Sequence, residues 1–296
     1  MKGDSFKGTG VALATPFAKD GSVDHAGLER LVTHTLDGGL DYLVVMGTTA
    51  ESPTLSMSEK ADVLSTVVSS NKKGLPIIYG AGANDTAELC DYFKDPLFST
   101  VDAILSVAPY YNKPSQKGLQ AHFEKIADHS PVPVILYNVP SRTVVNLEAS
   151  TTLCLAQHEN IRGIKEASGD FNQCNQLLAE KPEDFLVISG EDMITLPLLS
   201  MGASGVISVM ANAYPKQFST LVNQALLGKY DKARKIHLSL VEMGRILSEE
   251  GNPAGLKCVL ELLGICEGVL RLPLVPISPE LKVRAQKAIN ELNKKG

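Results

Sequence analysis

Short apolar runs alternate along most of the chain with longer stretches in which apolar residues recur at helical spacing. The runs are rich in Val, Ile and Leu, which is typical of strands in a parallel sheet that helices cover. The predicted strands are residues 11–17, 42–47, 76–82, 103–109, 133–139, 161–167, 185–190 and 205–211. The predicted helices are residues 24–36, 58–70, 84–94, 116–129, 147–157, 171–180, 193–201 and 216–227, with Asn84 as the expected N-cap of the third.

Eight strand–helix units within about 220 residues predict an α/β fold, the (β/α)8 TIM barrel. A doubly wound sheet is the alternative, but it usually has fewer strands and a glycine-rich phosphate-binding turn after the first one. Residues 18–21 form an ordinary turn instead. Beyond Gly228 the alternation stops, and residues 230–247, 254–263 and 278–292 are predicted to be helical. We therefore expect a catalytic barrel over residues 1–228 and a C-terminal helical domain over residues 229–296.

Composition excludes several classes of protein. The 296 residues are 44% hydrophobic and 21% charged, an ordinary globular balance, and the formal charge is −5. Basic residues are scattered, so we expect no nucleic-acid partner. No apolar run reaches the ~18 residues of a membrane-spanning helix, and residues 1–7 lack a secretory apolar segment. Five widely spaced cysteines without a C-x-x-C pair indicate reduced thiols in a cytoplasmic protein.

The chain also lacks the common signatures of bound ions and nucleotides. Its six histidines show no metal-binding spacing, and there is neither a P-loop nor a G-x-G-x-x-G motif. We therefore expect no metal site and no cofactor. Candidate chemistry has to come from side chains at the C-terminal ends of the strands, where barrel enzymes place their active sites.

Lys165 is the central candidate because it lies near the end of the sixth apolar run, residues 161–167. Taken alone, this segment favours a solvated lysine at a strand end. The alternative is an amine kept neutral for chemistry, which can attack a carbonyl and form a Schiff base. Tyr137 holds the corresponding place in the fifth strand, about 5 Å away across one strand gap, where a phenol could transfer protons. Arg142 follows on the next loop and could clamp a second carboxylate in bidentate fashion.

Three further strand ends supply candidates. Thr48 and Thr49 follow a glycine, so their hydroxyls and backbone N–H groups suit a small carboxylate, although an ordinary polar turn is the alternative. The tandem Tyr110 and Tyr111 after the fourth strand could fill an interface or carry protons. Gly190 allows close approach of backbone to a ligand, and the lack of basic residues nearby argues against a phosphate site. Such a pocket suits carbon–carbon bond chemistry on small keto acids.

Four motifs in order resemble the dihydrodipicolinate synthase family of class I pyruvate-dependent aldolases, over nearly the whole chain. They are Gly47-Thr48-Thr49-x-Glu51-Ser52, Tyr110-Tyr111-Asn112, Tyr137-Asn138-Val139-Pro140-Ser141-Arg142-Thr143 and Gly163-Ile164-Lys165-Glu166-Ala167. The resemblance implies a lyase that condenses pyruvate with L-aspartate 4-semialdehyde, giving 4-hydroxy-tetrahydrodipicolinate in diaminopimelate and lysine biosynthesis. It also implies a homotetramer built from tight dimers.

The resemblance assigns roles to individual residues. Lys165 would form the Schiff base, Tyr137 would shuttle protons, and Thr48 would connect Tyr137 to Tyr111 of the neighbouring subunit. The implied substrate-binding residues are Thr49 and the backbone of Ile207 for pyruvate, Gly190 near them, and Arg142 for the carboxylate of the second substrate. Ala50 stands where the family usually has Gly, and Glu191 where it usually has Asp.

A lysine-effector site is implied by Ser52, Asn84, Glu88 and Tyr110. The positions at which sensitive bacterial enzymes often carry histidine are Met57 and Lys60 here. A cationic Lys60 would repel the ammonium groups of lysine, so we expect weak or absent inhibition.

Two alternatives remain at this point. The first is another pyruvate-dependent aldolase, such as N-acetylneuraminate lyase or a keto-deoxy sugar acid aldolase, which shares the lysine and the strand-five tyrosine. Thr48-Thr49, the tyrosine pair and Arg142 favour the synthase. The second is a non-catalytic barrel that binds a keto acid, and the presence of both Lys165 and Tyr137 argues against it.

Overall fold

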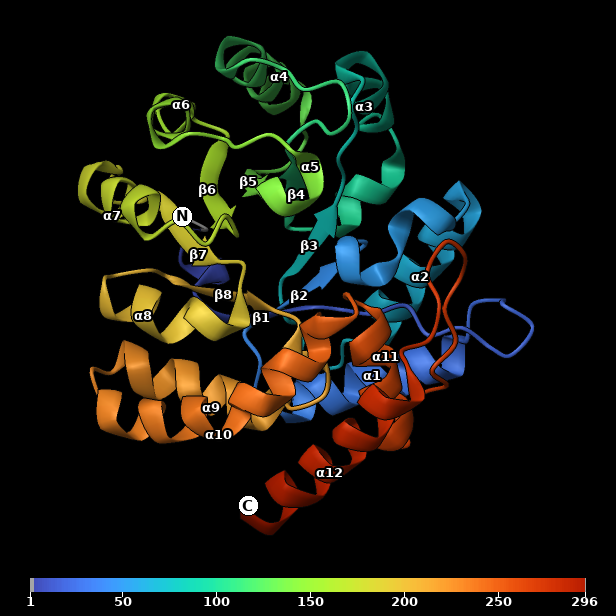
Figure 1. Cartoon of the computed structure of the whole chain (residues 1–296). Coiled ribbons are helices and arrows are strands. Elements are labelled where there is room, and N and C mark those ends of the chain that lie inside the picture. Colours follow the sequence, from blue (N-terminus) through green and yellow to red (C-terminus); the bar gives the residue numbers. More distant parts are fainter. Residues whose placement is uncertain (1–2, 296) are drawn as a thin grey trace.

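The computed structural model describes residues 3–295 and contains a closed barrel of eight parallel strands in sequence order (Figure 1). The expected (β/α)8 TIM barrel is therefore confirmed. The strands are β1 (Gly8–Ala12), β2 (Tyr42–Val45), β3 (Ile77–Gly80), β4 (Ala103–Val107), β5 (Val134–Asn138), β6 (Ile161–Glu166), β7 (Leu186–Ser189) and β8 (Gly205–Ser208).

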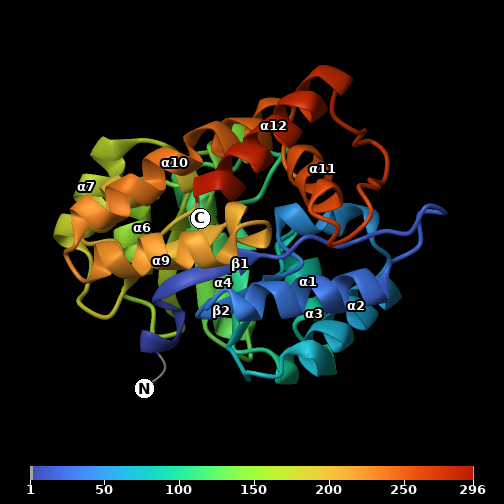
Figure 2. The same cartoon turned by 90° about the horizontal axis from the view of Figure 1, so that it is seen from below.

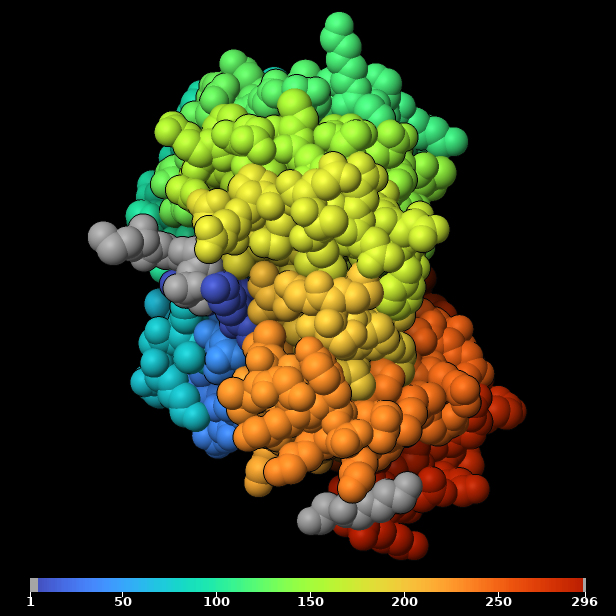
Figure 3. All heavy atoms as spheres, turned by 90° about the vertical axis from the view of Figure 1, so that its left-hand side faces the viewer, coloured from blue at the N-terminus to red at the C-terminus, as the bar shows by residue number. Residues whose placement is uncertain are grey.

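Helices surround the strands in the order in which the chain supplies them. The helices of the barrel are α1 (His25–Asp37), α2 (Met57–Ser70), α3 (Thr86–Tyr92), α4 (Gln116–His129), α5 (Pro140–Thr143), α6 (Ala149–Leu155), α7 (Phe171–Glu180), α8 (Thr195–Ser200) and α9 (Pro215–Leu226). Figure 3 shows one flank, on which successive segments of the chain follow one another from green to orange. The short α5 has no counterpart among the predicted helices.

Local sequence explains several helix starts. Ser56 and Glu59 form a capping box at the start of α2, in which each side chain satisfies a backbone N–H of the other. Asp85 caps α3 by accepting from the backbone N–H groups of Ala87 and Glu88. The prediction of Asn84 as this cap is wrong, because the carboxylate one position later reaches both free N–H groups.

The first strand also differs from its prediction. It covers Gly8–Ala12, whereas the apolar run predicted residues 11–17. The glycines of this strand lack the apolar side chains that mark a strand in the sequence, and neighbouring side chains leave no room for a Cβ at Gly8 or Gly10. A Cβ on Gly10 would lie 2.0 Å from the Tyr42 ring, and one on Gly205 would lie 2.1 Å from the carbonyl oxygen of Gly8. Leu13 and Phe17 remain buried beyond the strand.

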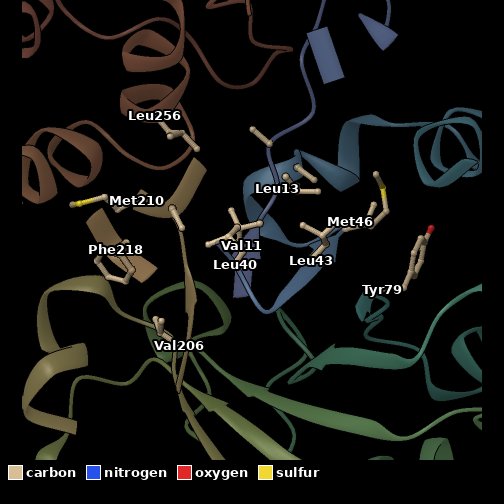
Figure 4. Packing of buried hydrophobic residues seen from close by; sticks show 14 of the residues in the cluster. Val11, Leu13, Leu40, Leu43, Met46, Tyr79, Val206, Met210, Phe218 and Leu256 are labelled. Carbon is tan, nitrogen blue, oxygen red and sulfur yellow. The ribbon is translucent and has the colours of Figure 1, made fainter. Parts of the chain in front are cut away.

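Two apolar layers fill the molecule. The barrel interior holds Tyr42, Val44, Ile78, Leu105, Ile135, Tyr137, Ile188 and Ile207, with Phe6 in the same cluster. The second layer lies between strands and helices, and part of it is shown in Figure 4. Tyr137 and Ile207 therefore face the inside of the barrel, as strand alternation requires.

Three helices follow the barrel: α10 (Tyr230–Glu249), α11 (Ala254–Leu262) and α12 (Pro279–Lys295). Helix α10 packs along α9, and α12 packs on α10 and α11 (Figure 2). Leu256 of α11 belongs to the same buried cluster as Val11 and Val206 of the barrel (Figure 4). The helices thus share one core with the barrel, and the domain boundary at residue 228 stays a prediction. None of the helices within residues 3–295 is long and apolar enough to cross a membrane.

Candidate active site

Lys165 and Tyr137 are direct neighbours in the pairing of β5 with β6, which confirms their predicted adjacency. The Lys165 side chain is 5% exposed, and its Nζ lies 4.3 Å from the centroid of the Tyr137 ring. Within the described part of the chain, the amine has no hydrogen-bond or ion-pair partner. The interpretation of this segment as a solvated strand end is therefore wrong, because the strand carries Lys165 into the barrel interior.

Asn138 and Glu166 form the next register pair along β5 and β6, and their hydrogen bonds fix the position of the Tyr137–Lys165 pair. Asn138 lies opposite Glu166, and its side-chain amide donates to both carboxylate oxygens at 3.2 and 3.1 Å. Gln173 of α7 and the backbone N–H of Ser168 also donate to the Glu166 carboxylate. Since side chains alternate along a strand, these polar contacts lie on the helix side while Lys165 and Tyr137 face inward.

Gly190 lies close to Lys165, and Ile207 belongs to the interior cluster that contains Tyr137. A Cβ on Gly190 would lie 3.1 Å from Cε of Lys165 and 2.7 Å from Cβ of Ala167. Gly190 therefore leaves the space that the lysine side chain occupies. Ile207 is buried on β8 in the same interior cluster as Tyr137.

The loop after β2 forms two short 3-10 turns, Thr48–Ala50 and Ser52–Thr54. The backbone N–H groups of Thr48 and Thr49 donate to no backbone acceptor in the described turns and loops, which leaves them available to a carboxylate. The side chain of Thr49 is buried, and its Oγ1 accepts from Nδ2 of Asn252 at 3.0 Å. Ala50 is not among the residues with positive φ, so the methyl group that replaces the family's glycine causes no backbone strain.

A cavity of about 720 Å³ opens at this end of the barrel. Thr48, Tyr137 and Arg142 line it together with Ser52, Glu88 and Tyr110 of the predicted effector site. Lys165, Thr49, Ile207, Gly190 and Tyr111 do not belong to its lining. The structure thus brings Tyr137, the Thr48 loop and Arg142 together around one cavity.

Arg142 lies in α5, on the exposed rim of this cavity. Its Nη2 donates to the carbonyl oxygen of Asn252 at 3.2 Å. Asn252 therefore contacts both Thr49 and Arg142, two residues predicted to bind carboxylates. Sequence reasoning missed this role, because Asn252 lies far along the chain in the connection between α10 and α11.

Tyr111 does not join the other candidates within one subunit. Its side chain is 90% exposed, and its backbone has a φ of 73°, a left-handed value that is strained for a bulky residue. The neighbouring loops hold this conformation, since Asn112 donates to the Asn84 carbonyl and Asn84 donates to the Tyr110 carbonyl. The phenol is therefore exposed in the single subunit and is absent from the cavity lining.

Three of the four predicted effector residues, Ser52, Glu88 and Tyr110, line the cavity, and Asn84 does not. Met57 and Lys60 line it as well. Burial lowers the pKa of Lys60, and the nearby Glu88 carboxylate acts in the opposite direction. The Glu88 carboxylate thus already has a cationic neighbour from its own chain.

No group of three or more His, Cys, Asp or Glu side chains within residues 3–295 has the arrangement of a metal site. The chemistry that the described residues can perform is that of an amine, a phenol, hydroxyls and a guanidinium.

Comparison with known proteins gives a consistent result. Residues 5–292 match the dihydrodipicolinate synthetase family. A 4-hydroxy-tetrahydrodipicolinate synthase from Flavobacterium psychrophilum is 49% identical over 98% of this chain and 99% of its own. The chloride-inhibited dihydrodipicolinate synthase from Acinetobacter baumannii, solved with pyruvate, is 38% identical with a TM-score of 0.94 over 97% of this chain and 99% of its own.

A third similar protein is the synthase from Cyanidioschyzon merolae, solved with lysine bound. It is 36% identical with a TM-score of 0.93, over 98% of this chain and 99% of its own. The matches extend over the barrel and the C-terminal helices alike. The chain therefore belongs to the dihydrodipicolinate synthetase family, which confirms both the family resemblance and the lyase class that the motifs indicate.

Proposed function

We propose that this chain condenses pyruvate with L-aspartate 4-semialdehyde to give 4-hydroxy-tetrahydrodipicolinate, for the biosynthesis of diaminopimelate and lysine. The observation that carries the proposal is the buried Lys165 amine beside the Tyr137 phenol, without a counter-charge among the described residues. The synthases named above support the choice of substrates.

The reaction begins with attack of the Lys165 amine on the C2 carbonyl of pyruvate, and loss of water gives an imine. Loss of a proton from C3, which Tyr137 shuttles, converts the imine to an enamine. The C3 carbon then forms a bond to the aldehyde carbon of the second substrate, and the aldehyde oxygen takes up a proton as its C=O π bond breaks and becomes the hydroxyl group of the product. The amino group of that substrate attacks C2, closes the ring and releases Lys165 as a free amine.

The remaining residues bind and orient the substrates. Thr48 and Thr49 hold the pyruvate carboxylate through hydroxyls and backbone N–H groups, and the Ile207 backbone and Gly190 bound the same space. Arg142, on the cavity rim, binds the carboxylate of aspartate semialdehyde. Thr48 connects Tyr137 to Tyr111 of a neighbouring subunit, and the 90% exposure of Tyr111 supports a role outside its own barrel. The assembly is a homotetramer of two tight dimers.

A substrate assay tests the proposal. Purified protein is incubated with pyruvate and either aspartate semialdehyde or N-acetylmannosamine, and consumption of each is followed. We expect only aspartate semialdehyde to be consumed at a catalytic rate. Consumption of N-acetylmannosamine instead would assign the chain to another pyruvate-dependent aldolase, and consumption of neither would contradict an enzymatic role.

Lysine should inhibit this enzyme weakly. Lys60 and Glu88 both line the cavity, where the Lys60 ammonium repels a second cation. Steady-state rates measured with millimolar lysine should remain close to the uninhibited rate, and Lys60→His should increase the sensitivity. Potent inhibition of the unaltered enzyme at that concentration would show that the proposed repulsion is absent.

A further inference from the structure

A buried ion pair joins the loop after β2 to the C-terminal helices. Glu51 precedes the second 3-10 turn of that loop, and Lys257 lies on α11. Both side chains are 0% exposed, and their charged ends are in contact. The Lys257 Nζ also donates to the carbonyl oxygen of Val269 at 2.8 Å and lies 3.9 Å from the centroid of the Phe17 ring.

Fold stability is a weak explanation for such a pair. Removing two charges from water is costly, and well-packed apolar residues of similar size are often equally stabilising or more so. A role in fixing the local geometry remains, and the position of Glu51 supports it.

Glu51 has a left-handed backbone with φ of 54° and ψ of 35°, which is strained for a residue with a side chain. Its N–H donates to the carbonyl oxygen of Thr48, so the conformation of Glu51 sets the turn that carries Thr48 and Thr49. Both carboxylate oxygens are held from the C-terminal segment, Oε1 by Lys257 and Oε2 by the backbone N–H of Arg271. The strained residue is therefore fixed by groups more than 200 positions away in the sequence.

A second contact fixes the same turn independently. Nδ2 of Asn252 donates to Oγ1 of Thr49 at 3.0 Å. Because the hydroxyl oxygen accepts this bond, its hydrogen is free to be donated to a ligand. The two contacts act on adjacent parts of one turn and both come from the segment around the start of α11.

We propose that Glu51 and Lys257 are positioning residues that hold the Thr48–Thr49 turn in the geometry that binds the pyruvate carboxylate. This inference rests on the proposed function. It predicts that loss of the ion pair weakens recognition of the carboxylate while the reactivity of the Lys165 amine is kept. The C-terminal helices would then be part of the substrate site as well as a cover for the barrel.

The test compares pyruvate with acetone, in which a methyl group replaces the carboxylate. Each compound is trapped on Lys165 with borohydride, and the modified peptide is quantified by mass spectrometry. For Lys257→Met we expect the half-saturating pyruvate concentration to rise at least tenfold, while the rate of acetone trapping stays within twofold of the unaltered protein. Melting temperatures are measured in parallel.

Two further variants keep the test informative if Lys257→Met does not fold. Glu51→Gln with Lys257→Gln replaces the pair by two neutral amides, and Asn252→Ala removes only the contact to Thr49. Both should show the same selective loss for pyruvate. Lys282→Met is the matched control, because it removes an exposed ion pair with Glu261 elsewhere in the C-terminal helices.

An unchanged pyruvate half-saturation in the folded variants would overturn the proposal. An equal loss of pyruvate and acetone trapping would also overturn it, because it would mean a general disturbance of the site. Failure of the unaltered protein to trap pyruvate at all would instead contradict the proposed function.

Discussion

Among single residues, side-chain alternation in β5 and β6 places the candidate catalytic residues on one face of the sheet and the residues that support them on the other. Lys165 and Tyr137 face the barrel interior as one register pair, and Glu166 and Asn138 form the next pair on the opposite face. The outer pair is joined by hydrogen bonds that Gln173 and Ser168 extend. Buried polar groups that are fully hydrogen-bonded make such a region rigid. Lys165 and Tyr137 are therefore positioned by hydrogen bonds on the helix side of the strands, opposite the barrel interior that they face.

Replacing Tyr137 by phenylalanine should remove proton transfer without disturbing the fold. We expect kcat to fall by about 10²- to 10⁴-fold, the usual contribution of a positioned acid or base. Steady-state kinetics with both substrates measure this. Tyr42→Phe is the matched control, because Tyr42 is another buried interior phenol, which donates to the Val206 carbonyl at 3.0 Å. It should lose about 1 kcal/mol of stability and keep its turnover. Equal turnover in the two variants would remove Tyr137 from the mechanism.

At the scale of elements, the loops that carry the candidate residues rest on helices packed around the barrel. Helix α3 follows the loop that contains Asn84 and packs against α4. His122 of α4 is buried at this contact, where its Nδ1 lies 2.9 Å from the Thr86 hydroxyl and its Nε2 has no partner among the described residues. The contact between α3 and α4 thus includes a titratable side chain, His122, and α3 also supplies Glu88 to the lining of the cavity.

Burial lowers the pKa of His122 to about 4 from an ordinary value of 6.5. Above pH 6.5 the side chain is neutral in both the folded and the unfolded chain. Between pH 6.5 and 4 only the unfolded chain takes up the proton, so stability falls as the pH falls. Urea unfolding at pH 7.5 and pH 5 should show about 2 kcal/mol less destabilisation by acid in His122→Asn than in the unaltered protein. An identical pH dependence would mean that His122 is protonated alike in both states.

The elements show what the sequence can and cannot reveal. Seven strands and the helices between them follow from their apolar patterns, because each is a contiguous segment covered by its neighbours. The pattern misplaced β1, since a Cβ on Gly8 would meet the Asp41 side chain and one on Gly10 would meet the Tyr42 ring, contacts that no local pattern reveals. The contact between Asn252 and Thr49 could not be predicted from the sequence for a different reason. It joins residues 203 positions apart, and no local pattern marks it.

The motifs predicted which residue types gather at the barrel mouth, and the register places Tyr137 beside Lys165 as expected. The family resemblance implied that Tyr111 acts in a neighbouring subunit, but the positive φ that accompanies its exposure could not be predicted, because a bulky residue type disfavours it.

At the scale of the whole molecule, the barrel and the three C-terminal helices form one packed body with one shared core. The site depends on this arrangement, because Asn252 and Lys257 reach the turn that carries Thr48 and Thr49. It also depends on a second copy of the chain if the exposed Tyr111 completes a neighbouring site. An assembly with two-fold symmetry would exchange this residue between both partners.

Mixing two inactive variants tests this exchange. Tyr111→Phe and Lys165→Ala should each have little activity alone. After the subunits are dissociated together and reassembled, half of the dimers contain one of each, and one site in such a dimer has both native residues. We expect recovery of about a quarter of the unaltered activity. Omitting the dissociation step is the control, and the absence of recovery in confirmed mixed dimers would place Tyr111 outside the neighbouring site.

We propose that Lys165 forms a covalent imine with pyruvate. Its most direct measurement is borohydride reduction in saturating pyruvate, followed by proteolysis and mass spectrometry of the lysine-containing peptides, with Lys165→Ala as the control. We expect one reduced pyruvate adduct per chain, on Lys165, with loss of activity in parallel and no adduct in the control. An unmodified Lys165, or an adduct that persists in the Lys165→Ala variant on another lysine, would contradict it.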